Sequence, residues 1–223
     1  CLRGISQSDL QAGTALLGGE PPWGALTGVR PVKLPTRAME EGSTPRQAEA
    51  MLKHYHVSPV RRQLAMDCAQ ASLAVKRSLQ PEEISLYVGI PFCPTRCAYC
   101  SFISASGSAN PLIPAYLDAL FGEIDAAGEA ARRAGKTVRT VYIGGGTPTT
   151  LAPDQLKALL DRLHTAFDLA PGTEFTVEAG RPDTITREKL EAIRDGGGNR
   201  ISVNPQTMSD LVLETIGRSH RAE

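Results

Sequence analysis

Short apolar runs alternate with longer amphipathic stretches from residue 84 onward, and this alternation constrains the fold more than any other feature. Strands are predicted by four β-branched runs: ISLYVGI (84–90), VRTVYI (138–143), EFTVE (174–178) and RISVN (200–204). Helices are predicted between them, over 114–135, 153–167 and 187–197. A strand–helix repeat of this kind predicts an α/β fold with a parallel sheet, or part of a (β/α) barrel, over residues 83–223.

Residues 1–82 predict a separate, partly helical accessory region. Thr44-Pro45 and Ser58-Pro59 each place a hydroxyl residue before proline, which is typical of a helix start because the hydroxyl caps free amides and proline fits the first turn. The glycine- and proline-rich stretch 1–42 predicts only loops around a short element.

The helix that begins after Ser58 has an apolar pattern that includes Cys68. Val60, Leu64 and Cys68 recur at helical spacing, with Ala71 and Val75 continuing the series. We therefore expect this face to be buried, with Cys68 as a small apolar residue within it.

Composition excludes several classes of partner and compartment. The chain has 24 basic and 24 acidic residues and no long block of one sign, so no phosphate-binding face for nucleic acid is predicted. We find neither an apolar run long enough for a membrane span nor a secretory signal. Five cysteines, three of them within eight residues, do not resemble a disulfide framework, and a reducing, cytoplasmic location is expected. Because the sequence begins at Cys1 rather than Met and ends after an apolar segment, we expect a piece of a longer protein.

The segment GIPFCPTRCAYCSF (89–102) carries Cys93, Cys97 and Cys100 with no other metal-binding side chain close by. Structural zinc normally takes four ligands, whereas a [4Fe–4S] cluster held by three cysteines keeps one iron free to bind something else. The pattern favours the cluster. A zinc site completed by a distant residue and three unligated thiols are the alternatives.

Polar or glycine-rich residues follow each predicted strand. The cysteines follow the first strand, Gly144-Gly145-Gly146 follows the second, Glu178 closes the third, and Asn204-Pro205-Gln206 follows the fourth. The carboxyl ends of parallel strands meet at one edge, so we expect these residues on one rim, where chemistry sits in such folds. Glu178 there favours a polar ligand, with an ordinary surface carboxylate as the alternative.

The run VYIGGGTPT (141–149) matches neither the dinucleotide pattern G-x-G-x-x-G nor a P-loop, because it lacks the lysine. Three glycines after a strand allow the backbone to approach a ligand closely. A simple tight turn is the alternative interpretation.

The spacing C-x₃-C-x₂-C, with Tyr99 directly before the last cysteine, resembles the signature of the radical S-adenosylmethionine (SAM) enzymes. That resemblance implies a partial TIM-like barrel of the radical SAM type. It also implies that the open iron is chelated by SAM, and that the reduced cluster donates the electron that releases a 5′-deoxyadenosyl radical. On the same basis, Gly145, Gly146 and Thr147 are expected to receive the methionyl amino group.

Five segments in order resemble the oxygen-independent coproporphyrinogen III oxidase family: LYVGIPFCPTRCAYCSF, VYIGGGTPTTL, TVEAGRPDTIT, RISVNPQTM and IGRSH. The stretch WGALTGVRPVKL (23–34), with EAGRPDTIT, is similar in particular to the HemZ-type coproporphyrinogen dehydrogenases. The resemblance implies that Cys93, Cys97 and Cys100 hold the cluster. The SAM contacts that it implies are Tyr87, Tyr99, Gly145, Gly146, Thr147, Glu178, Gln206 and Arg218.

The implied reaction is oxidative decarboxylation of coproporphyrinogen III to protoporphyrinogen IX, with a porphyrinogen or another small molecule as substrate and a separate electron donor as partner. Two positions depart from the oxidases' pattern: Phe102 stands where they carry a fourth cysteine, and Gly89 stands where they have a histidine. The related haem chaperones share the phenylalanine. A haem-delivery protein of the same fold is therefore the alternative.

Overall fold

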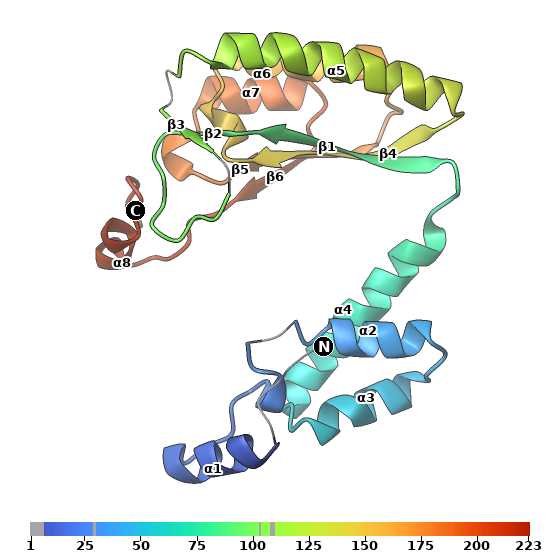
Figure 1. Ribbon diagram of the computed structural model, residues 1–223, viewed down its shortest axis with the longest axis vertical. Coiled ribbons are helices and arrows are strands. Elements are labelled where there is room, and N and C mark those ends of the chain that lie inside the picture. The colour runs from blue at the N-terminus through green and yellow to red at the C-terminus, as the bar shows by residue number, and fades with distance from the viewer. Residues whose placement is uncertain (1–6, 29, 103, 108–109) are drawn as a thin grey trace. The chain divides into compact units, whose positions relative to one another are not determined.

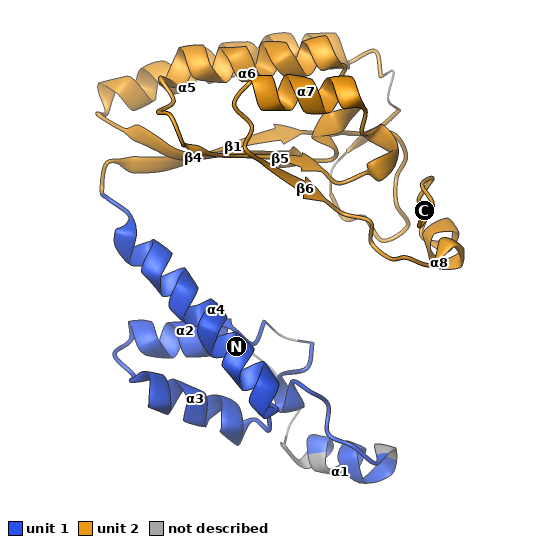
Figure 2. Ribbon diagram, turned by 180° about the vertical axis from the view of Figure 1, so that it is seen from behind, with its two compact units in different colours: residues 1–80 blue, residues 81–223 orange. Residues whose placement is uncertain are grey.

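The computed structural model describes residues 7–28, 30–102, 104–107 and 110–223 (Figure 1). Cys1 lies outside these described residues. The chain divides into two compact units, residues 1–80 and 81–223 (Figure 2). No helix among the described residues is long and apolar enough to cross a membrane.

The second unit is built on a four-stranded sheet in which every neighbouring pair is parallel. Its strands lie in the order β1 (Glu83–Ile90), β4 (Thr137–Gly145), β5 (Glu174–Ala179) and β6 (Arg200–Val203). All four coincide with the predicted runs to within two residues at either end. The predicted α/β fold with a parallel sheet is therefore confirmed.

Three helices form a single layer over one face of this sheet (Figure 1): α5 (Ile113–Arg133), α6 (Pro153–Phe167) and α7 (Arg187–Asp195). The core lies between the two layers, where Val141, Ile143, Phe175 and Val177 of the strands belong to the same buried cluster as the leucines of α6. Burial of these apolar side chains drives the two layers together.

The face of the sheet that the helices do not cover is largely polar. Strand residues alternate between the two faces, so Tyr87, Tyr142, Gly144 and Glu178 lie on the face away from α6. The four described strands form an open sheet and do not close a barrel.

Several short elements shape the rim without having been predicted. They are the strand pair β2 (Phe92–Cys93) and β3 (Ala105–Ser106), the 3₁₀ turns η2 (Pro148–Thr150) and η3 (Pro182–Thr184), and helix α8 (Asp210–Thr215). Each is shorter than the window over which hydrophobic periodicity can be recognised.

The first unit is helical, with α1 (Gln7–Leu17), the 3₁₀ turn η1 (Gly24–Leu26), α2 (Lys33–Glu40), α3 (Pro45–His54) and α4 (Pro59–Ser78). Thr44 caps α3 as predicted: its hydroxyl accepts a hydrogen bond from the Gln47 amide at 3.3 Å, and its own amide donates to Gln47 Oε1 at 2.8 Å. Ser58 precedes α4 but makes no side-chain capping bond. The prediction of only a short element in residues 1–42 was wrong, because α1 and α2 both lie there.

The predicted buried face of α4 was also wrong. Val60 is 76% exposed and Val75 is 58% exposed, and the thiol of Cys68 is exposed as well. The helix instead buries a neighbouring stripe: Ala65, Met66, Ala69 and Leu73. On this stripe the alanines let the helices approach closely while Met66 and Leu73 fill the cluster shared with α2 and α3.

Candidate functional site

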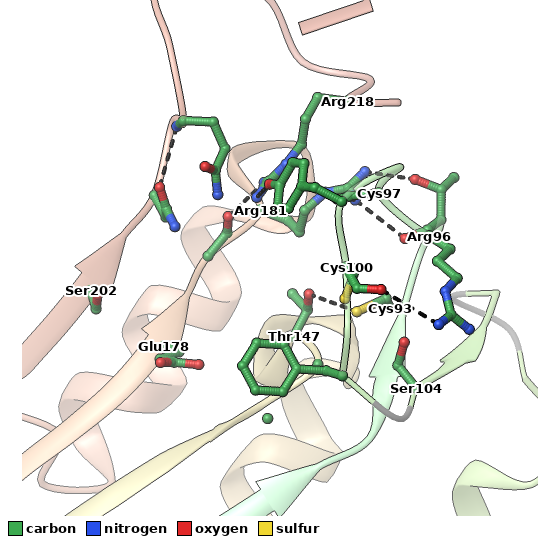
Figure 3. Close-up of a pocket in the computed structure, with 18 of the residues that line it drawn as sticks. Cys93, Arg96, Cys97, Cys100, Ser104, Thr147, Glu178, Arg181, Ser202 and Arg218 are labelled. Carbon is green, nitrogen blue, oxygen red and sulfur yellow. Dashed lines mark hydrogen bonds between the residues drawn. The ribbon is translucent and has the colours of Figure 1, made fainter. Parts of the chain in front are cut away.

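A cavity of about 230 Å³ opens at the carboxyl ends of the strands (Figure 3). Every site residue predicted from the sequence lines it: Tyr87, Cys93, Cys97, Tyr99, Cys100, Gly145, Gly146, Thr147, Glu178, Gln206 and Arg218. These residues come from four strand ends and from the segment around α8. The parallel topology therefore brings together side chains separated by more than half of the sequence, from Tyr87 to Arg218.

The cysteine loop, residues 93–100, follows β1 and lines the cavity at the carboxyl ends of the strands. Cys93 lies on β2, and the amide of Cys100 donates to the carbonyl of Cys97 at 3.1 Å, which turns the loop back on itself. All three thiols are free and partly exposed. Among the described residues, no three His, Cys, Asp or Glu side chains converge as ligands of a single metal ion. The thiols are distributed along the wall of one cavity.

The glycine-rich turn after β4 passes directly beneath this loop. Gly145 has a φ of +111°, which favours glycine, and the Gly146 amide donates to Ile90 O at 2.8 Å. A β-carbon at Gly146 would lie 2.7 Å from Phe92 O and 3.0 Å from Cys93 Sγ. The next residue, Thr147, is buried and its hydroxyl lies 3.4 Å from the same sulfur. The turn needs glycine because the cysteine loop packs against its backbone.

Glu178 extends from β5 on the polar face of the sheet and is held by a residue that the sequence did not single out. Tyr142 donates its hydroxyl hydrogen bond to Glu178 Oε1 at 2.5 Å, and this bond raises the pKa of Tyr142 to about 12. The ring of Tyr87 stacks on Tyr142 with centroids 6.0 Å apart. Strand alternation was the available signal, because Tyr142 stands two residues before Gly144 and so shares its face.

The segment after β6 closes the other side of the cavity. Arg218 donates to Gly180 O at 2.8 Å and to the hydroxyl of Tyr99 at 3.2 Å. Gln206 has a φ of +66°, an uncommon conformation for a residue other than glycine. Two buried polar atoms of the lining, Arg218 Nε and Ser104 Oγ, have no hydrogen-bond partner among the described residues. Buried polar atoms are normally paired, so these two are available to a ligand.

A second residue that the sequence analysis did not select is Arg181, in the loop after β5. Its side chain is 3% exposed and donates to Cys97 Sγ at 3.4 Å (Figure 3). Arg96 and Arg218 also line the cavity, so three arginines share it with the cysteines. Arg181 is buried although its partner Thr95 is exposed and Cys97 is only half-buried, and only the fold reveals that these partners belong to the cysteine loop.

The chain is similar to several known proteins. The family model described as the Radical SAM superfamily matches residues 87–223. Over 207 residues the chain is 39% identical to the oxygen-independent coproporphyrinogen-III oxidase-like protein HemZ of Bacillus subtilis, covering 90% of this chain and 41% of that protein. It is 40% identical over 138 residues to the heme chaperone HemW of Bacillus subtilis, covering 61% of this chain and 35% of the chaperone.

Among solved structures, coproporphyrinogen III oxidase (HemN) from Escherichia coli, a radical SAM enzyme, superimposes with a TM-score of 0.58 at 30% identity. This match covers 68% of the present chain and 34% of the oxidase. The chain thus spans less than half the length of each of these relatives.

Proposed function

Because this chain belongs to the radical SAM superfamily, whose members use a [4Fe–4S] cluster and S-adenosylmethionine, we propose that its rim cavity binds both and begins radical chemistry there. The observation that carries this proposal is the convergence of three thiols, a glycine turn, a carboxylate and an arginine on a single cavity. When bound, the reduced cluster supplies the electron that cleaves SAM to a 5′-deoxyadenosyl radical. The chain's own residues bind, orient and shield these groups.

Cys93, Cys97 and Cys100 are the proposed cluster ligands. Thiolates are the usual ligands of iron–sulfur clusters, and the donor set of the loop fits. The bare backbone of Gly146 beneath Cys93 Sγ supports the assignment, because a side chain there would occupy the space against the thiol. Cys68 is exposed, belongs to the first unit and is not among the proposed ligands.

The proposed contacts of SAM are Tyr87, Tyr99, Gly145, Gly146, Thr147, Glu178, Gln206 and Arg218. Glu178 offers a carboxylate to an amino group or a ribose hydroxyl, and Tyr142 holds it in place. The unpaired Nε of Arg218 offers a donor to an anionic group such as a carboxylate. The charged side chains of Glu178 and Arg218 and the hydroxyl of Thr147 in this lining support a charged, hydrogen-bonding ligand.

For the overall reaction, we propose oxidative decarboxylation of coproporphyrinogen III to protoporphyrinogen IX, in the cytoplasm and with an external electron donor. The resemblance to HemZ and to HemN supports it. The alternative is haem delivery, which the similarity to HemW and the presence of Phe102 support. Phe102 lines the cavity and is 65% exposed, so it presents an apolar ring where the oxidases' pattern has a thiol.

Gly89 bears on the same choice, because the oxidases' pattern has a histidine there. A β-carbon at Gly89 would meet only Tyr87 Cε1, at 3.7 Å, so the space could accept a side chain. Crowding therefore does not account for the glycine. A glycine at this position supplies no imidazole for proton transfer, which favours the delivery alternative on this single point.

The first test is anaerobic reconstitution with iron and sulfide, followed by low-temperature EPR of the reduced protein with and without SAM. We expect a [4Fe–4S]⁺ signal that shifts when SAM is added. We expect Cys97→Ala to lose most bound iron and sulfide, while the matched control Cys68→Ala retains them. An unshifted signal, or full cluster content in Cys97→Ala, would contradict the assignment.

The second test separates the two overall functions. An anaerobic assay with coproporphyrinogen III should release CO₂ and yield a vinyl-bearing product if the oxidase proposal holds. Stoichiometric haem transfer to an apoprotein, without decarboxylation, would establish the delivery alternative in its place.

A further inference from the structure

Arg181 lies between the cysteine loop and an acidic residue, in the turn that joins β5 to η3. Only 3% of its side chain is exposed. A buried guanidinium group normally has hydrogen-bond partners for its N–H donors, and the identity of those partners indicates the role of the arginine.

Each nitrogen of the Arg181 guanidinium has a partner. Nη1 donates to Thr95 O at 3.3 Å and to Cys97 Sγ at 3.4 Å, and Nη2 donates to Thr95 Oγ1 at 2.8 Å. On its other side, Nε and Nη2 donate to the two carboxylate oxygens of Asp183 at 3.3 and 3.4 Å. The planar fork therefore ties the segment between Cys93 and Cys97 to the loop after β5.

The two other arginines of the lining act differently. Arg96 donates to the backbone carbonyl of Cys100 at 3.5 Å, and Arg96 is exposed. Arg218 donates to a carbonyl and a phenol. The guanidinium of Arg181 is both buried and in contact with a sulfur, where solvent screens its charge least.

We propose that Arg181 is a positioning residue for the cysteine loop and raises the reduction potential of the cluster held through Cys97. This inference rests on the proposed function. One-electron reduction adds a negative charge to the cluster, and a cation that hydrogen-bonds to a ligand sulfur stabilises the reduced form more than the oxidised one. The carboxylate of Asp183 opposes this effect, because it partly neutralises the same guanidinium.

Substitutions of Arg181 and Asp183 should shift the midpoint potential in opposite directions. A residue that only held the loop in place would not produce such opposite shifts. Arg181→Met removes the charge and should lower the midpoint potential. Asp183→Asn leaves the guanidinium unbalanced and should raise it. Arg181→Lys keeps the charge without the fork, so its potential should stay nearer to that of the wild type while the loop is held less firmly.

The experiment is an EPR-monitored redox titration of the reconstituted wild-type protein and the three variants, without substrate, with iron and sulfide content measured alongside. At a fixed solution potential we expect Arg181→Met to have about a tenfold lower ratio of reduced to oxidised cluster, which is about 59 mV in midpoint potential for one electron. Asp183→Asn should shift in the opposite direction.

Equal midpoint potentials in all four proteins, or shifts of the same sign in Arg181→Met and Asp183→Asn, would overturn the inference. If Arg181→Met assembles no cluster, the positioning role is supported and the sign of the Asp183→Asn shift decides the electrostatic one. Failure of the wild type to assemble a cluster would instead refute the proposed function itself.

Discussion

Substitution of Gly146 by alanine tests the packing between the glycine turn and the cysteine loop. The added methyl group would lie 2.7 Å from Phe92 O, 3.0 Å from Cys93 Sγ and 3.1 Å from Ile90 O, all shorter than ordinary van der Waals contact. Two of these atoms are backbone oxygens, which cannot rotate away. Ile90 ends β1, and Phe92 is held in the β2–β3 pair. The turn or the cysteine loop must therefore move.

Overpacking of this kind typically lowers the free energy of unfolding by about 1–3 kcal/mol. With a urea dependence of about 2 kcal/mol per molar, the unfolding midpoint should fall by roughly 1 M. We expect this shift in urea unfolding of the cluster-free protein, followed by far-UV circular dichroism. After reconstitution, iron and sulfide content should also fall, because the methyl group displaces Cys93.

Gly180→Ala is the matched control, because Gly180 lines the same cavity but a β-carbon there meets nothing within 4 Å. Its free energy of unfolding should stay within about 0.5 kcal/mol of the wild type. The reasoning would be refuted if Gly146→Ala kept the unfolding midpoint and iron content of the wild type, or if both variants lost them equally.

Further expectations concern the polar face of the sheet and helix α4. The hydrogen bond to Glu178 raises the pKa of Tyr142 to about 12. Its contribution to stability is therefore fully present below pH 10 and is lost as the pH rises through 12. In Glu178→Gln, ultraviolet titration of tyrosinate should place the pKa of Tyr142 nearer 10. A wild-type protein in which all tyrosines titrate near pH 10 would contradict that contact. Leu73 is buried, so Leu73→Ala should lower the free energy of unfolding by about 2–5 kcal/mol. Cys68 is exposed, so Cys68→Ala should change it by less than about 0.5 kcal/mol. Chemical denaturation of both variants measures these changes, and the opposite order would contradict the burial of this stripe.

The strands and long helices of the second unit follow from local pattern alone. Apolar residues recur every second position in the strand that contains Val141 and Ile143, and about every 3.6 positions in α6. These periods identify a strand and a helix, and both elements bury the same core. The rim could be predicted too, because parallel strands place their carboxyl ends together whatever the loops contain.

Helix α4 shows where this kind of reasoning fails. Val60 and Leu64 belong to the predicted stripe that stays exposed, whereas the neighbouring stripe packs into the core of the first unit: Ala65, Met66, Ala69 and Leu73. Side-chain size predicts burial only when the packing partner is known. The buried side of this helix was set by contacts within the first unit.

The sequence by itself determined the α/β class of the second unit and the chemical groups on its rim, since cysteine spacing, glycine runs and strand periodicity are local properties. The tertiary structure alone decided which side chains hold those groups in place. Tyr142 meets Glu178, and Arg181 meets Cys97, across 36 and 84 positions of sequence. The physical reason is that a hydrogen bond depends on distance and direction in space, and strand pairing and loop packing set these only after the chain has folded.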